Sequence, residues 1–198
     1  MTKVALLNDQ ELITLYKSGS EWAFAELLKR HKSKVYATIY LLVRDREQAE
    51  DLFQEAFIRI IDILRAGKYT EEGRFGGFAV RVARNLTIDY LRAPKHKGMI
   101  LLEHDHDFFK KRKYHADNAE EAFIRSEMHE QLLFLLDSLP ADQREVVVLR
   151  HFADLSFKEI AETTASNLST VLGRMRYALR HIRIKMQQNP EQIVDLLA

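Results

Sequence analysis

Arginine and lysine side chains gather in two separate segments of the chain. The first, 65–97, holds eight basic and three acidic residues, and the second, 168–186, holds five basic residues and no acidic one. Over the whole chain 30 lysines and arginines nearly balance 29 aspartates and glutamates, so their distribution is more informative than the net charge of +1. Clustered basic groups bind phosphates, and two clusters predict two contacts with nucleic acid. Basic helix faces that are merely solvated are the alternative interpretation.

The second basic segment has the spacing of an amphipathic helix, with apolar residues along one side and small, polar and basic residues on the other. The apolar side comprises Leu168, Val171, Leu172, Met175, Leu179 and Ile182. The residues that we predict to contact DNA are Ser169, Thr170, Gly173, Arg174, Arg176, Tyr177 and Arg180. Arginine can donate two hydrogen bonds to one guanine, whereas threonine and tyrosine can reach bases or phosphates.

A shorter helix is predicted directly before this basic helix. Ser156 and Glu159 form an S-x-x-E capping box, and the helix ends within 163–166, where polar and small residues break the apolar pattern. Asn167 can then cap the basic helix. A short helix, a tight turn and a longer basic helix predict a helix-turn-helix, whose second helix enters the major groove. A helical hairpin with solvated arginines would give a similar pattern.

The first basic segment contains a predicted helix over 75–92, preceded by a glycine-containing loop. Its apolar stripe consists of Phe75, Phe78, Val82 and Leu86. Arg81, Arg84, Asn85 and Arg92 lie away from that stripe. The Asn85 amide has both a donor and an acceptor and could read a base, although it could equally bond a neighbouring backbone group.

Acidic and amide residues form a stripe on a third predicted helix, 46–64. Its apolar positions are Ala49, Leu52, Phe53, Ala56, Phe57, Ile60 and Leu64, and Asp45 and Gln48 provide an N-terminal cap. Beside this core face lie Asp51, Gln54, Glu55 and Ile58. Acidic groups repel DNA, so this stripe is not expected to bind DNA, and an ordinary solvated face is one interpretation of it.

The elements that carry these residues are helices in every case, and the predicted fold class is all-α. Only seven glycines and three prolines interrupt the chain, and apolar residues recur at intervals of three and four. Ser20 can cap a long helix that runs through Leu42, Trp22 is expected in the core, and Pro140 suits the first turn of a later helix. We predict a helical domain over 1–93, a flexible linker over 94–118, a helix-turn-helix domain over 119–188 and a tail over 189–198.

Several classes of protein are disfavoured by composition. The chain has no cysteine, which excludes disulfides, thiolate zinc sites and cysteine nucleophiles. No apolar run approaches the roughly 20 residues of a membrane span, and no secretory signal pattern is present, so a cytoplasmic protein is expected. His104 and His106 with their neighbouring aspartates could suggest a metal site, but they lie in the predicted linker. We therefore expect no metal, no cofactor and no catalytic site.

Two stretches resemble a known family. Residues 139–183 resemble region four of the extracytoplasmic-function (ECF) subgroup of bacterial RNA polymerase sigma factors. The shared elements there are Leu139-Pro140, Arg144, Leu149-Arg150, Leu155-Ser156, Glu159-Ile160-Ala161, Thr170-Val171, Arg174 and Ala178. Residues 45–60 and 75–92 resemble region two of the same subgroup, most specifically in Ala49-Glu50-Asp51-Leu52 and Gln54-Glu55.

This resemblance implies a two-domain sigma factor that has no enzymatic activity of its own. The implied partners are core RNA polymerase, through the clamp helices of its largest subunit and its flap, promoter DNA, and a cognate anti-sigma factor. Asp51, Gln54, Glu55 and Ile58 would contact the core enzyme. The minus-ten element would be opened and held by Arg74, Phe78, Arg81, Arg84, Asn85 and Arg92, and the basic helix of 168–186 would read the minus-thirty-five element.

Four positions depart from the family pattern. The family usually has tryptophan at the position of Phe78, glycine near Ala165, a hydrophobic residue near Ser166 and often a basic residue at the position of Leu172. Phe78 keeps an aromatic side chain, whereas the other three leave the promoter sequence open. A stand-alone helix-turn-helix regulator that binds as a dimer and a helical adaptor that binds only protein are the two other functions considered.

Overall fold

The computed structural model describes residues 7–70, 73–93 and 130–188, and within these ranges the chain forms helices and no strands. It divides into two compact units, one containing helices α1 to α4 and the other α6 to α8. The prediction of an all-α protein is therefore confirmed. The predicted linker 94–118 and tail 189–198 lie outside the described residues, and the domain boundaries remain predictions.

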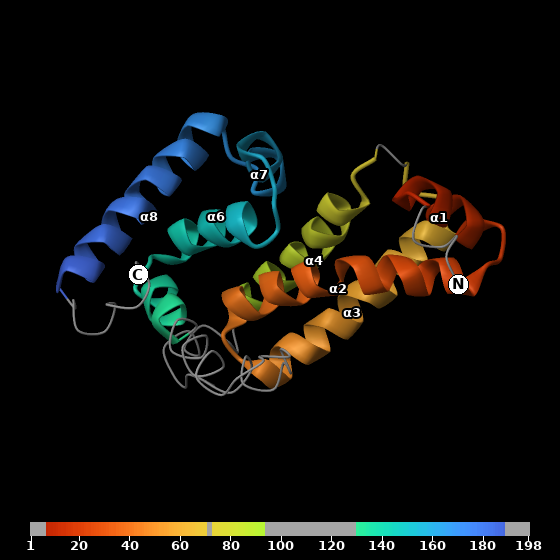
Figure 1. The fold of residues 1–198 in the computed structure, drawn as a ribbon, viewed down its shortest axis with the longest axis horizontal. Coiled ribbons are helices and arrows are strands. Elements are labelled where there is room, and N and C mark those ends of the chain that lie inside the picture. The colour runs from red at the N-terminus through yellow and green to blue at the C-terminus, as the bar shows by residue number, and fades with distance from the viewer. Residues whose placement is uncertain (1–6, 71–72, 94–129, 189–198) are drawn as a thin grey trace, which may run out of the picture. The chain divides into compact units, whose positions relative to one another are not determined.

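The N-terminal unit consists of α1 (Asp9–Lys17), α2 (Glu21–Val43), α3 (Arg46–Arg65) and α4 (Phe75–Arg92) (Figure 1). The helix α2 packs against both α1 and α4. The core of the N-terminal unit includes the fully buried side chains of Leu27, Ile39, Tyr40, Ile60 and Phe75. Because burying one such side chain stabilises a fold by about 1.5–3 kcal/mol, these residues hold α3 and α4 in place from their inner faces.

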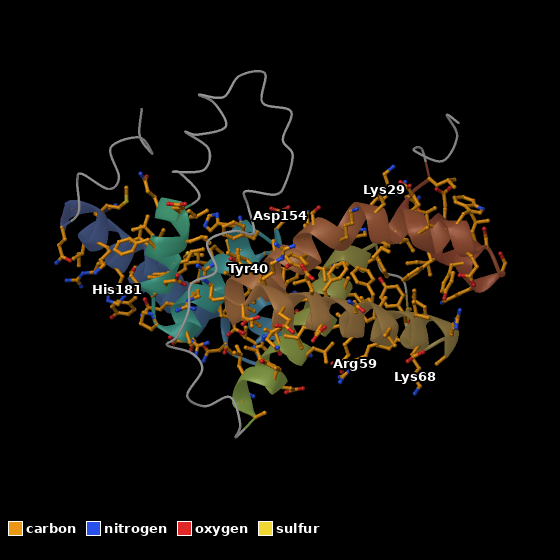
Figure 2. All side chains as sticks on the ribbon, turned by 90° about the horizontal axis from the view of Figure 1, so that it is seen from below. Lys29, Tyr40, Arg59, Lys68, Asp154 and His181 are labelled. Atoms are coloured by element: carbon orange, nitrogen blue, oxygen red, sulfur yellow. The ribbon has the colours of Figure 1, made fainter. Side chains whose placement is uncertain are left out.

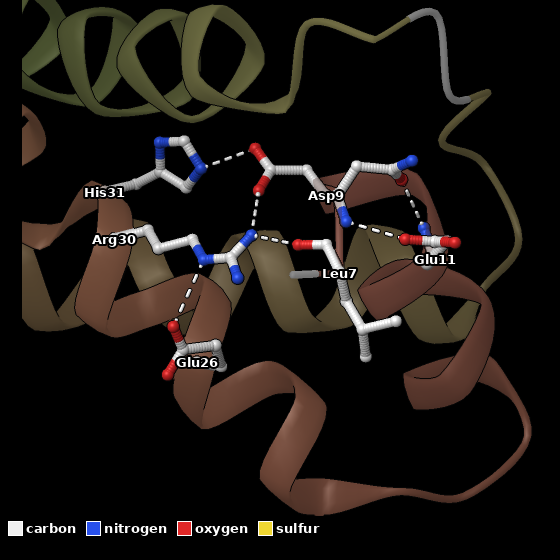
Figure 3. Close-up of polar contacts among 7 residues, drawn as sticks. Leu7, Asp9, Glu11, Glu26, Arg30 and His31 are labelled. Carbon is white, nitrogen blue, oxygen red and sulfur yellow. Dashed lines mark hydrogen bonds and ion pairs between the residues drawn. The ribbon is translucent and has the colours of Figure 1, made fainter. Parts of the chain in front are cut away.

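A polar network ties α1 to α2 (Figure 3). The Asp9 carboxylate lies 2.7 Å from His31 Nε2 and 3.3 Å from Arg30 Nη1, and Arg30 also donates to the Leu7 carbonyl at 2.7 Å. The His31 ring packs edge-on to Phe75, at 5.3 Å between ring centroids. The start of α4 is thus braced against the rest of the unit by side chains that the sequence pattern did not single out.

The C-terminal unit contains α6 (Ala141–His151), α7 (Phe157–Thr163) and α8 (Leu168–Gln188), and residues 130–137 before them are also helical. Helix α8 packs on both α6 and α7. Pro140 is the N-cap of α6. The sequence predicted it in the first turn, one position later, and assignments of helix ends commonly differ by one or two residues.

A half-buried arginine closes the turn before α6. Arg144 donates to the backbone carbonyls of Leu136, Asp137 and Leu139 at 3.1–3.4 Å. Burial lowers the pKa of the Arg144 guanidinium, and the nearby Asp137 carboxylate opposes that effect. Arg144 thus supplies side-chain donors to carbonyls at the end of the preceding helix and in the turn that follows it.

One expectation about the core was wrong. The side chain of Trp22 is 46% exposed at the start of α2 and does not belong to the core. On α8 the residues that face α6 and α7 are Val171, Met175 and Ala178, whereas Leu168, Leu172 and Leu179 are exposed. The buried face of α8 is rotated away from the centre of its apolar stripe, because only two short helices cover it.

Candidate nucleic-acid and protein interfaces

The predicted helix-turn-helix is present in α7 and α8. Ser156 and Glu159 form the expected capping box, with Ser156 N donating to Glu159 Oε2 at 2.8 Å. Between the helices, Ser166 N donates to the Ala161 carbonyl at 2.9 Å and Ala165 N to the Glu162 carbonyl at 3.3 Å. These two bonds are the Schellman motif that commonly ends a helix.

The turn explains two of the departures from the family pattern. Ala165 occupies the position of the motif that requires a left-handed backbone, and its φ is +50°. A non-glycine residue in this conformation costs roughly 1–2 kcal/mol, which accounts for the glycine usually found there. Ser166 occupies the next position, where the motif often has a hydrophobic contact, and its hydroxyl instead lies 3.4 Å from Arg174 Nη1.

The first turn of α8 is ordered by one side-chain oxygen. Asn167 Oδ1 accepts hydrogen bonds from the Thr170 backbone N–H at 2.8 Å, the Thr170 hydroxyl at 2.7 Å and the Ser169 hydroxyl at 2.7 Å. Asn167 is thus the N-terminal cap that the sequence predicted. Ser169 and Thr170 are exposed, and each hydroxyl oxygen that donates to Asn167 can still accept a hydrogen bond.

The remaining predicted DNA contacts lie along the outer side of α8. Arg176, Tyr177 and Arg180 are exposed, and a Cβ added to Gly173 would meet nothing within 4 Å. Arg174 is half-buried, because its Nε lies 3.1 Å from the Asp142 carboxylate at the start of α6. The helix therefore presents the predicted residues to solvent with one of its arginines held by an acid of a neighbouring helix.

The predicted single-strand contacts lie on and before α4. Arg74, Arg81, Asn85 and Arg92 are exposed, and Arg84 donates to Asn85 Oδ1 at 3.2 Å. The side-chain oxygen of Asn85 therefore accepts a hydrogen bond from the neighbouring Arg84 side chain.

An aromatic cluster joins the preceding loop to α4. The half-buried ring of Phe78 lies 4.4 Å from that of Tyr69, and Tyr69 also meets Phe75 edge-on at 5.9 Å. The Tyr69 carbonyl accepts from Lys17 Nζ at 3.2 Å. Tyr69 was not among the predicted residues, although an aromatic residue within a polar, glycine-containing loop could have signalled it.

The acidic stripe of α3 lies on the exposed side of that helix. Asp51, Gln54, Glu55 and Ile58 are all exposed, and the Ile58 side chain is 58% accessible. Glu55 Oε1 lies 2.6 Å from Arg59 Nη2, and Arg59 extends outward from α3 (Figure 2). An isoleucine at the centre of a charged surface is typical of a protein-binding face, where apolar area is surrounded by polar groups.

The described residues contain no group of three or more histidine, aspartate or glutamate side chains that could hold a metal ion. The alternative site around His104 and His106 lies outside the described residues. No helix in the described ranges is long and apolar enough to cross a membrane.

Two family models match the chain. Sigma-70 region 2 matches residues 27–96, which include α3, α4 and the loop between them, and Sigma-70 region 4 matches residues 129–182, which include the helix-turn-helix.

Among curated proteins, the chain is 33% identical over 158 residues to the ECF RNA polymerase sigma factor SigE of Mycolicibacterium smegmatis, covering 80% of this chain and 59% of that relative. It is 30% identical over 171 residues to the ECF RNA polymerase sigma factor SigW of Bacillus subtilis, covering 83% and 90% of the two chains.

Two solved structures share the fold. One is that of CnrH in complex with the cytosolic domain of CnrY, with a TM-score of 0.64 at 18% identity, covering 91% of this chain and 98% of that one. The other is the sigma factor RpoE with the anti-sigma factor NepR from Bartonella quintana, with a TM-score of 0.61 at 16% identity, covering 83% and 96%. The two matched regions and the relatives together show that the chain belongs to the ECF family of RNA polymerase sigma factors.

Proposed function

We propose that this sigma factor directs core RNA polymerase to its promoters through three separate surfaces. The stripe on α3 binds the core enzyme, α4 and its preceding loop hold the opened minus-ten element, and α8 reads the minus-thirty-five element as duplex. The observation that carries the proposal is the first half of α8, where a basic, acid-free outer face begins with two hydroxyls ordered by Asn167.

The core-binding surface combines acids with an exposed isoleucine. Asp51 and Glu55 would pair with basic side chains of the clamp helices of the largest subunit, and Ile58 would supply the apolar centre of the contact. This face is unsuited to DNA because its carboxylates would repel phosphates.

The minus-ten surface requires a pocket for an unpaired base and cations for the backbone. Phe78, packed on Tyr69, supplies an aromatic surface on which a base could stack. Arg74, Arg81 and Arg92 would contact phosphates, and Asn85 with its neighbour Arg84 would bond a base edge.

The minus-thirty-five surface follows the usual docking of a helix-turn-helix. Ser169, Thr170 and Arg174 lie in the first two turns of α8, the part of a recognition helix that contacts base edges. Arg176, Tyr177 and Arg180 extend the surface toward the phosphates.

We also propose that the protein acts in the cytoplasm, has no catalytic activity of its own and is held inactive by an anti-sigma factor. RNA synthesis then belongs to the core enzyme. Support for the last point comes from the two structural relatives, which were solved with CnrY and with the anti-sigma factor NepR.

The test is transcription from a fragmented genomic library by purified core RNA polymerase with and without this protein. The expected result is a set of new start sites that share two spaced upstream elements. Salt-sensitive DNA binding without new start sites would instead favour a stand-alone regulator, and absence of both would favour an adaptor that binds only protein.

A further inference from the structure

One ion pair connects the start of α6 to the recognition helix. Asp142 Oδ2 lies 3.1 Å from Arg174 Nε, and the two residues are far apart in the chain. The side chain of Asp142 is 50% exposed and that of Arg174 is 28% exposed. Asp142 belongs to the first turn of α6, so its backbone is fixed by a helix.

The ion pair lies at Nε, and the guanidinium has four further N–H donors, two on each Nη. Arginine reads guanine by donating from two nitrogens at once, which requires the planar group to be held in one orientation. The ion pair of Nε with the Asp142 carboxylate and the hydrogen bond that Nη1 donates to Ser166 Oγ at 3.4 Å restrict that orientation, and neither uses Nη2 or the second N–H of Nη1.

The ion pair of Asp142 with Arg174 contributes little to the stability of the fold. An exposed or half-exposed ion pair contributes little to folding, and α6 and α8 are already joined by fully buried side chains such as those of Val146, Val148, Val171 and Ala178. At the same time a carboxylate beside a DNA-reading face weakens attraction to phosphates. Its presence there is consistent with a role in recognition.

We propose that Asp142 is a positioning residue that orients the Arg174 guanidinium for base readout by α8. The proposal rests on the proposed function of α8, and it deepens that function by naming a specificity-determining residue outside the recognition helix. Asp142 need not touch DNA: it acts by fixing the rotamer of the arginine that does.

The test measures binding of the complete holoenzyme, formed from core polymerase and the full chain, to duplexes randomised over the upstream promoter element. Asp142→Asn removes the charge and keeps the shape of the side chain. The expected result is a loss of discrimination of about 3- to 10-fold at one base pair, because a freely rotating arginine loses part of its bidentate preference. Affinity for unrelated DNA at the same salt concentration should stay the same or rise, since one negative charge is gone.

Three variants make the result specific. In an Arg174→Ala background, Asp142→Asn should cause no further loss of discrimination. Asp142→Glu, which keeps the carboxylate, should restore part of the preference. Glu162→Gln removes an exposed acid of α7 and should change nothing, and thermal unfolding of every variant checks the fold.

The inference would be overturned, with the proposed function intact, if Asp142→Asn left discrimination unchanged. It would also be overturned if Asp142→Asn caused the same loss of discrimination in the Arg174→Ala background. A rise in affinity for the preferred sequence with full discrimination would also overturn it, because Asp142 would then compete with DNA. A wild-type holoenzyme with no preference at all would refute the proposed function itself, and the inference with it.

Discussion

The Asn167 side-chain oxygen accepts from the Thr170 hydroxyl at 2.7 Å and from the Thr170 backbone N–H at 2.8 Å, so one residue both caps α8 and orients a hydroxyl on the side that we propose faces DNA. The same oxygen also holds the Ser169 hydroxyl. Stability of the helix and presentation of its first contacts therefore depend on a single group. Substitutions at Asn167 can separate its effect on helix stability from its effect on the two hydroxyls.

Asn167→Ala should lower both the stability of the protein and its affinity for promoters. Loss of an N-cap costs about 1 kcal/mol, which urea unfolding would measure. Asn167→Asp is the informative comparison, because aspartate caps a helix equally well but adds a negative charge beside the DNA. Its stability should match the wild type while promoter affinity falls, and equal promoter affinity in Asn167→Asp would argue against DNA contact at this turn.

Ala165→Gly should stabilise the C-terminal unit. The left-handed backbone at Ala165 costs roughly 1–2 kcal/mol, and glycine removes that cost while adding about 0.5–1 kcal/mol of unfolded-state entropy, so a net gain of up to about 1.5 kcal/mol is expected. The urea midpoint of unfolding measures it. The matched control is Ala25→Gly at an exposed position of α2, where the same change should destabilise the protein.

Asp51→Lys with Glu55→Lys should abolish association with core polymerase and leave the helices folded. Both side chains are exposed, so the charge reversal acts on the partner and not on the core of the unit. Co-purification with core enzyme and circular dichroism provide the two measurements. Asp89→Lys with Glu162→Lys changes the net charge equally at exposed sites outside α3 and should retain binding; retained binding in the α3 variant would show that the docking surface lies elsewhere.

The sequence predicted the helices and the outward faces of the three interfaces, because periodicity reports which residues of a helix share a side. It could not predict which neighbour covers that side. Leu168, Leu172 and Leu179 lie on an apolar stripe, yet they are exposed because α6 and α7 pack against an adjacent face. Trp22 is exposed for a related reason: a large apolar side chain near a helix start is buried only if another element reaches it.

Long-range pairs were also beyond the sequence pattern. The contacts of Asp142 with Arg174 and of Tyr69 with Phe78 depend on how helices and loops pack, and neither pair has a characteristic spacing. Local motifs were accessible because their partners are three residues apart. The capping box of Ser156 and Glu159 and the Asn167 cap are examples, and both are present.

Arg174→Ala should weaken promoter binding by about 1–3 kcal/mol if its guanidinium contacts a base, and the loss should be largest for the preferred sequence. Arg180→Ala should weaken binding to all sequences by similar factors and reduce the salt dependence, since a phosphate contact carries no sequence information. Equilibrium binding of the holoenzyme at several salt concentrations distinguishes the two. A uniform loss in Arg174→Ala would reassign that arginine to the phosphates.

Phe78→Ala should impair promoter opening more than promoter binding. Phe78 is half-buried beside Tyr69, so part of its side chain is accessible to an unpaired base, and loss of such stacking costs about 1–3 kcal/mol. Permanganate reactivity of minus-ten thymines reports the opened strands, and binding to a duplex with only the minus-thirty-five element reports docking. Phe78→Trp keeps the aromatic surface and should open promoters at least as well as the wild type. If Phe78→Ala opens promoters normally while remaining folded, the base is held by another part of the unit, and the exposed Arg81 and Asn85 on the same helix become the groups to substitute next.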